Sequence, residues 1–88
     1  MSKKTLGEII RSRRLQKGWT AKELIKKLDE DLSPTYIAKI ELHDEIPSPE
    51  LLSKMADVLG LGLERLVRIV KRDKIKQFKI YINKKYTV

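Results

Sequence analysis

Residues 20–42 read TAKELIKKLDEDLSPTYIAKIEL, and this stretch decides the fold. It contains two helix starts on either side of a short acidic turn. Thr20 is followed three residues later by a glutamate, a capping-box pattern in which hydroxyl and carboxylate each accept a backbone amide. Ser33 and Pro34 form a second start signal, because Ser is a favoured N-cap and Pro is tolerated at the first helical position. The spacing of leucine and isoleucine then predicts helices over 20–28 and 34–42.

The flanking sequence predicts three more helices with similar punctuation. Thr5 opens the first, over 5–17, and Gly18 suits the left-handed residue that ends a helix. A fourth lies between Ser48 and Gly60, and a fifth begins near Gly62 and runs to residue 70. The apolar stripe of the first consists of Leu6, Ile9, Ile10 and Leu15. The fourth runs through Leu51, Leu52, Met55, Val58 and Leu59, and the fifth through Leu63, Leu66, Val67, Ile69 and Val70.

Beyond residue 72 the apolar pattern fits both a helix and a strand. Ile75, Phe78 and Ile82 have helical spacing, whereas Phe78, Ile80 and Ile82 alternate as in a strand. We favour a helix, whose apolar face pairs with a second copy of the chain. The expected organisation is one domain over 1–72 and a basic C-terminal extension over 73–88.

Composition excludes several classes of protein. The chain has no cysteine and one histidine, so we expect neither a disulfide framework nor a metal site. It has no Gly-rich phosphate loop and no nucleophile beside a base, so we expect no catalytic residue, no cofactor and no enzyme. It has no apolar run long enough for a membrane span or a signal peptide. We therefore expect a soluble cytoplasmic protein.

The charge distribution points to an anionic partner. The chain carries 20 Lys+Arg against 12 Asp+Glu, a net charge of +8, and nucleic acid is the usual partner of such a protein. Residues 1–27 hold nine bases and two acids, residues 28–64 hold two bases and nine acids, and residues 65–88 hold nine bases and one acid. Either the basic ends meet an anionic partner, or they are ordinary solvated surface.

Three pieces, LGEIIRSRRLQKGWTAKEL, SPTYIAKIE and IPSPELLSKMADVLGL, resemble in this order the lambda-repressor/Cro-type helix-turn-helix family, also called the xenobiotic-response-element type. The resemblance lies within residues 5–66. It implies an all-α, five-helix DNA-binding domain and a sequence-specific transcriptional regulator. The expected form is a repressor that binds double-stranded DNA as a homodimer, with helix 34–42 in the major groove. The alternative is an antitoxin, or another protein-interaction module on the same fold, with a toxin as its partner.

The resemblance also implies roles for individual residues. Thr35 and Lys39 fall where family members contact base edges, and the N-terminus of helix 20–28 falls where backbone amides grip a phosphate. Arg14 and Glu41 match a family pair that forms a partly buried salt bridge between two helices. The complete set of expected DNA-binding residues is Arg13, Lys17, Thr20, Ala21, Lys22, Ser33, Pro34, Thr35, Tyr36 and Lys39, with Arg11 as a further phosphate contact.

Three features depart from the family pattern. The acidic turn 29–31 is about two residues longer than the usual Gly-centred turn. Ala21 replaces a Gln that grips phosphate through its side chain. Asp44 and Glu45 stand where the family often places Gly and bases, and acids repel phosphate. Pro34, in addition, offers no hydrogen bond to a base.

Overall fold

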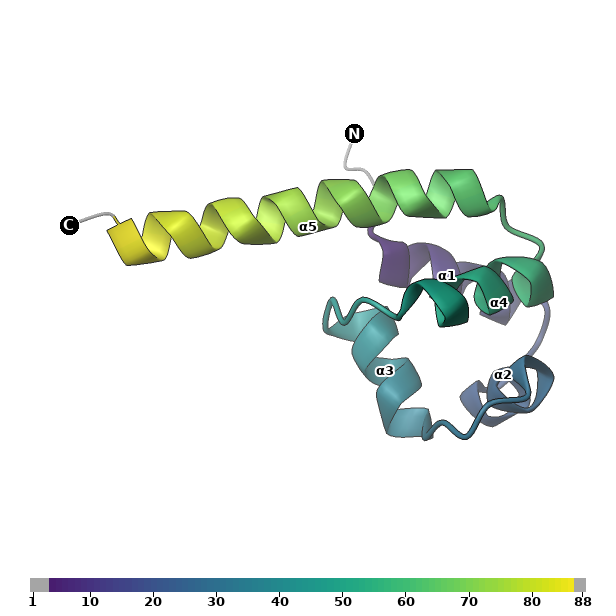
Figure 1. Cartoon of the computed structure of the whole chain (residues 1–88). Helices are drawn as coiled ribbons and strands as arrows, with labels where there is room; N and C mark the ends of the chain where they lie inside the picture. The colour runs from purple at the N-terminus through teal and green to yellow at the C-terminus, as the bar shows by residue number, and fades with distance from the viewer. Residues whose placement is uncertain (1–3, 87–88) are drawn as a thin grey trace.

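Five α-helices follow one another, with no strand in the part of the chain that the structure describes. The computed structural model describes the backbone of residues 4–86 and the side chains of residues 4–74. The helices are α1 (Leu6–Gln16), α2 (Ala21–Leu28), α3 (Pro34–Leu42), α4 (Pro49–Leu59) and α5 (Leu63–Tyr86) (Figure 1). The expected all-α, five-helix class is confirmed.

The helix starts are formed by the capping residues that the sequence indicates. The hydroxyls of Thr5, Ser33 and Ser48 each accept the backbone amide three residues on, at 3.1–3.2 Å. A hydroxyl at this position satisfies one of the amides that the first helical turn leaves without a partner. Local polar chemistry therefore fixes where α1, α3 and α4 begin.

The helices pack in three layers. α5 lies across α1 and α4, and α2 and α3 lie on the other side of those two helices (Figure 1). Between the layers sits one apolar core, to which every helix contributes. Its members are Leu6, Ile9, Ile10, Leu24, Leu28, Ile37, Ile40, Leu51, Leu52, Met55, Ala56, Leu59, Leu66 and Ile69.

The inward face of α1 differs from the expected one at a single position. Leu15 was expected to face inward, but 54% of its surface is exposed, whereas Arg14 is only 9% exposed. Arg14 is four residues after Ile10 and so lies on the same side of the helix. The next residue turns about 100° away, because an α-helix has about 3.6 residues per turn. Arg14 can take the inward position because a buried carboxylate pairs with it.

α1 and α3 cross at a glycine. A Cβ atom at Gly7 would lie 2.4 Å from the carbonyl oxygen of Ile40 and 2.6 Å from that of Glu41. Only a residue without a side chain allows the two backbones to approach so closely. Gly7 therefore sets the distance between α1 and the C-terminal half of α3.

α5 continues as one helix through the region that was ambiguous in the sequence. It reaches Tyr86, so the alternative between helix and strand is resolved in favour of the helix. The boundary expected between residues 72 and 73 falls inside this helix. The side chains of Ile75, Phe78 and Ile82 lie outside the described residues, and their pairing with a second copy stays a prediction.

Candidate DNA-binding surface

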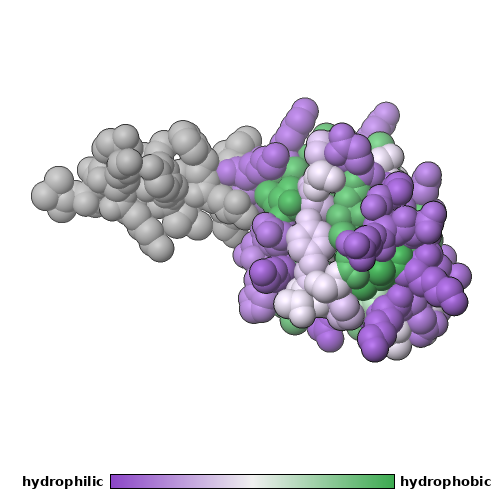
Figure 2. All heavy atoms as spheres, turned by 60° about the horizontal axis from the view of Figure 1, so that its bottom comes forward, coloured by the Kyte–Doolittle hydropathy of each residue, from purple (hydrophilic) through white to green (hydrophobic). Residues whose placement is uncertain are grey.

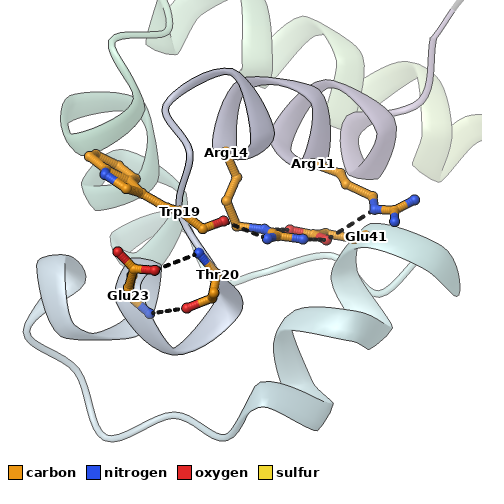
Figure 3. A network of polar contacts seen from close by, with 6 residues as sticks. All are labelled: Arg11, Arg14, Trp19, Thr20, Glu23 and Glu41. Atoms are coloured by element: carbon orange, nitrogen blue, oxygen red, sulfur yellow. Dashed lines mark hydrogen bonds and ion pairs between the residues drawn. The ribbon is translucent and has the colours of Figure 1, made fainter.

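A buried ion pair connects α1 to α3. Arg14 Nε donates to Glu41 Oε2 at 2.8 Å, and Arg14 Nη2 donates to Glu41 Oε1 at 2.9 Å (Figure 3). Arg14 Nη1 donates to the carbonyl oxygen of Trp19 at 2.8 Å, and Arg11 Nε lies 3.8 Å from Glu41 Oε1. The hydrogen bonds to Glu41 raise the pKa of Arg14, against the lowering effect of burial. The geometry holds α3 at a fixed angle to α1.

The exposed face of α3 carries the side chains that could read DNA. Ile37 and Ile40 point into the core, each with 1% of its surface exposed. Thr35 and Lys39 are exposed and four residues apart, so they lie one turn apart on the same face. Hydroxyl and ammonium groups can both bond to base edges in the major groove. Tyr36 is half-buried and packs against the core rather than standing free beside them.

The start of α3 has few polar groups of its own left to offer. Ser33 and Pro34 are exposed, but the Ser33 hydroxyl already accepts the Tyr36 amide. Pro34 has no N–H. The amides of Ser33 and Thr35 therefore remain as backbone donors for a phosphate or a base.

The start of α2 leaves two backbone amides without an intrahelical acceptor. Its capping box is complete: Glu23 Oε1 accepts the Thr20 amide at 3.2 Å, and Thr20 Oγ1 accepts the Glu23 amide at 3.1 Å (Figure 3). Of the four amides that a helix N-terminus leaves unpaired, those of Ala21 and Lys22 remain. Such amides, together with the helix dipole, bind phosphate. The Ala21 side chain packs against the core, and that of Lys22 is exposed.

The basic residues of α1 have different surroundings. Arg13 Nη1 donates to the carbonyl oxygens of Leu59 and Gly60, at 3.0 and 3.1 Å, and so caps the C-terminal end of α4. Lys17 is exposed, and its Nζ lies 5.3 Å from the ring centroid of Trp19. Arg13 therefore binds two carbonyl oxygens within the protein, and its expected contact with phosphate stays a prediction.

Three acids near α3 either adopt the left-handed backbone conformation or form an ion pair. Asp29 ends α2 with φ 54°, and Asp44 has φ 58° in the loop after α3. Both are in the left-handed conformation that glycine usually supplies and that Asp tolerates better than most residues. Glu30 forms an ion pair with Lys54 of α4, 2.5 Å apart. Asp29 and Asp44 therefore stand where the backbone conformation favours Gly, Asn or Asp, and Glu30 faces a base of α4.

Figure 2 shows the side of the molecule that carries α2 and α3. Hydrophilic side chains cover most of it, around a band of less polar residues. No group of three or more His, Cys, Asp or Glu side chains in residues 4–74 could hold a metal ion. Among residues 4–86, no helix has the length and apolar character needed to cross a membrane.

A model of the helix-turn-helix family matches residues 10–66, about two thirds of the chain. The chain belongs to this family. The match covers α2, α3 and α4 completely and confirms the resemblance to lambda-repressor/Cro-like proteins. This helix-turn-helix protein is therefore a DNA-binding protein of the transcription-regulator class. Neither a curated protein nor a solved structure matches the chain significantly.

Sequence reasoning missed three contacts that position α3 and α4. Gly7 meets the backbone of α3, Arg13 caps α4, and Lys54 pairs with Glu30. The contact of Gly7 could have been inferred from the sequence, because a glycine inside a helix costs about 1 kcal/mol relative to Ala and often marks close packing. The other two join residues far apart in the chain and leave no local pattern.

Proposed function

We propose that this helix-turn-helix protein is a sequence-specific repressor that binds its operator as a homodimer. In this proposal α3 enters the major groove, with Thr35 and Lys39 on base edges. The amides of Ala21 and Lys22 hold a phosphate, and Lys17 and Lys22 add positive charge. Arg13 is left out, because its guanidinium already binds two carbonyl oxygens of α4.

The observation that carries the proposal is the anchoring of α3. The Arg14–Glu41 pair and the close approach of Gly7 both act on its C-terminal half, while its N-terminal half is exposed. A reading helix needs a fixed angle, because a bidentate base contact depends on geometry. The structure supports such a helix, with two polar side chains on its outer face.

Dimerisation is supported by apolar side chains on α5. Leu63 and Val67 are 41% and 37% exposed and lie one turn apart on the helix. Dimers of this class read two half-sites about one helical turn apart. The proposal therefore includes a two-fold symmetric operator.

Binding to duplexes from the promoter regions beside its own gene tests the proposal. Fluorescence anisotropy at fixed salt should show one duplex bound about a thousandfold more tightly than unrelated DNA. Replacement of Lys39 by Ala should change the preferred base at one position of each half-site, at a cost of ~1–3 kcal/mol. Replacement of Lys22 by Ala should weaken all duplexes alike and reduce the salt slope by about one.

A matched control and a clear refutation are available. Lys26, also exposed on α2, is outside the expected contact set, so Lys26→Ala should have the smaller effect. Equal and weak affinity for every duplex would refute sequence-specific binding. An unchanged base preference in Lys39→Ala would remove that residue from the reading face.

A second candidate is an antitoxin that binds a neighbouring toxin as well as DNA. Leu42 at the end of α3 is 59% exposed, and acids at positions 44 and 45 follow it. An exposed apolar residue beside acids suits contact with a basic protein. Co-purification with the product of the adjacent gene tests this role, and a stable stoichiometric complex would support it.

A further inference from the structure

A basic groove lies between α5 and the start of α1. Its volume is 430 Å³, and its lining residues are Lys4, Ile9, Arg65, Arg68, Ile69 and Arg72. Four of these are bases and none is an acid. We propose that this groove binds an acidic peptide segment of a partner protein, with its carboxylates on the arginines and an aliphatic side chain on the floor.

The arginines form one row that is partly fixed in place. Arg65, Arg68 and Arg72 follow a spacing of three and four residues, so they share one face of α5. Arg72 is held from both sides: its Nη2 donates to the Lys4 carbonyl oxygen at 2.8 Å and to Asp73 Oδ1 at 3.2 Å. Arg65 and Arg68 are exposed, with no acidic partner in residues 4–74. A guanidinium whose position is already fixed binds a carboxylate at a smaller entropy cost.

The dimensions fit an extended peptide. Along α5 the three arginines span seven residues, or about 10 Å at 1.5 Å per residue. In an extended peptide, every second side chain points the same way, about 6.7 Å apart. Two acidic residues at alternate positions therefore fit within the length of the row, and the aliphatic side chain that reaches the floor is the next one on the same face, two residues further on.

The floor favours a peptide over nucleic acid. Ile9 and Ile69 line the groove between the bases and are nearly buried, with 7% and 9% of their surface exposed. An aliphatic side chain at the end of an acidic segment gains from contact with such a floor, whereas a phosphate chain has no apolar group to place there. α5 is also on the side of α1 and α4 opposite α3 (Figure 1), so a duplex held by α3 leaves the groove open.

The test uses the full chain and a short fluorescein-labelled peptide in which two Glu at alternate positions are followed, two residues later, by Leu, with Ser between them. A peptide with Gln in place of Glu is the neutral control. The variant is Arg65→Gln/Arg68→Gln, and the matched variant is Lys26→Gln/Lys71→Gln, which removes the same charge at exposed positions outside the groove. Far-UV circular dichroism and thermal unfolding verify that both variants fold. Methyl NMR of Ile9, Ile69 and Ile37 locates the contact.

We expect the acidic peptide to bind, the groove variant to lose affinity at least about tenfold, and the matched variant to lose less than about threefold. Methyl signals of Ile9 and Ile69 should shift, and that of Ile37 on α3 should not. Equal losses in both variants, equal binding of the neutral peptide, or no binding would overturn the proposal. So would displacement of the peptide by duplex DNA, or a loss of self-association in the groove variant alone. DNA affinity measured on the same samples reports on the repressor proposal separately.

Discussion

Replacement of Glu41 by Leu should destabilise the domain strongly, because it leaves a buried arginine without its carboxylate. The change removes two charge-assisted hydrogen bonds to Arg14, of 2.8 and 2.9 Å, each of which contributes ~1.5–3 kcal/mol. Together the two bonds contribute ~3–6 kcal/mol. Because Arg14 keeps its bond to the Trp19 carbonyl oxygen, we expect the lost stability to lie near the lower end of this combined range. The ion pair with Arg11 adds little, because that side chain is half exposed at 49%. We expect a cost of ~3–4 kcal/mol, in line with other broken buried pairs.

Such a cost is large for this chain. A domain of this size has a free energy of unfolding of ~4–13 kcal/mol, and each lost kcal/mol lowers Tm by ~4–8 °C. Urea unfolding followed by circular dichroism measures the loss. The informative control is the double variant Arg14→Met/Glu41→Leu, which replaces both charges by apolar groups of similar volume.

The double variant should recover most of the stability, since apolar replacement of a whole buried pair is often neutral. Its cost should be at least about 2 kcal/mol smaller than the sum of the costs of the two single changes. A single-variant cost below about 1 kcal/mol, or costs that simply add, would refute the view that this pair is a coupled, desolvated anchor.

Three further substitutions probe other contacts by urea unfolding. In a solvent-exposed helix, Gly→Ala adds about 0.5–1 kcal/mol of stability. Gly7→Ala should instead cost ~1–3 kcal/mol, because the new Cβ would collide with the Ile40 carbonyl oxygen. A more stable variant would contradict the close crossing of α1 and α3. Asp29→Gly should add ~0.5–1 kcal/mol, because it relieves a left-handed residue; a loss would mean that the carboxylate itself stabilises the turn. Arg13→Gln should cost ~1–2 kcal/mol with unchanged DNA affinity; lower affinity at full stability would place Arg13 on a phosphate instead.

Local chemistry explains why most of the fold could be predicted from the sequence. A cap acts within one turn of a helix, so Thr20, Ser33 and Ser48 reveal helix starts without knowledge of the rest of the chain. The resemblance to a family supplied the Arg14–Glu41 pair, which no local pattern indicates. Capping chemistry therefore predicted the helices, and the family resemblance predicted the ion pair that positions α3.

The remaining features depend on contacts between distant residues. Arg13 was expected to contact or attract phosphate because the first two helices carry an excess of bases, and its carbonyl partners, 46 and 47 residues away, could not be seen in that pattern. Leu15 was expected inside on hydrophobicity alone, but the paired Arg14 takes the inward position. For Leu15 a long-range polar partner of its neighbour decided the outcome, and a local pattern does not contain that partner; a phosphate contact of Arg13 stays a prediction.

The arrangement of α3 separates anchoring from reading. Gly7 and Arg14 act on Ile40 and Glu41, near the C-terminal end of the helix, while Thr35 lies six residues earlier. Six residues of helix are about 9 Å, so a small tilt at the anchor moves the N-terminal end by a larger distance. With few side chains available to read bases, specificity then depends on how firmly the anchor fixes that angle. The acids of the neighbouring turns fit this scheme, because the buried Glu41 serves the anchor while Asp29 and Asp44 shape the turns at either end of α3.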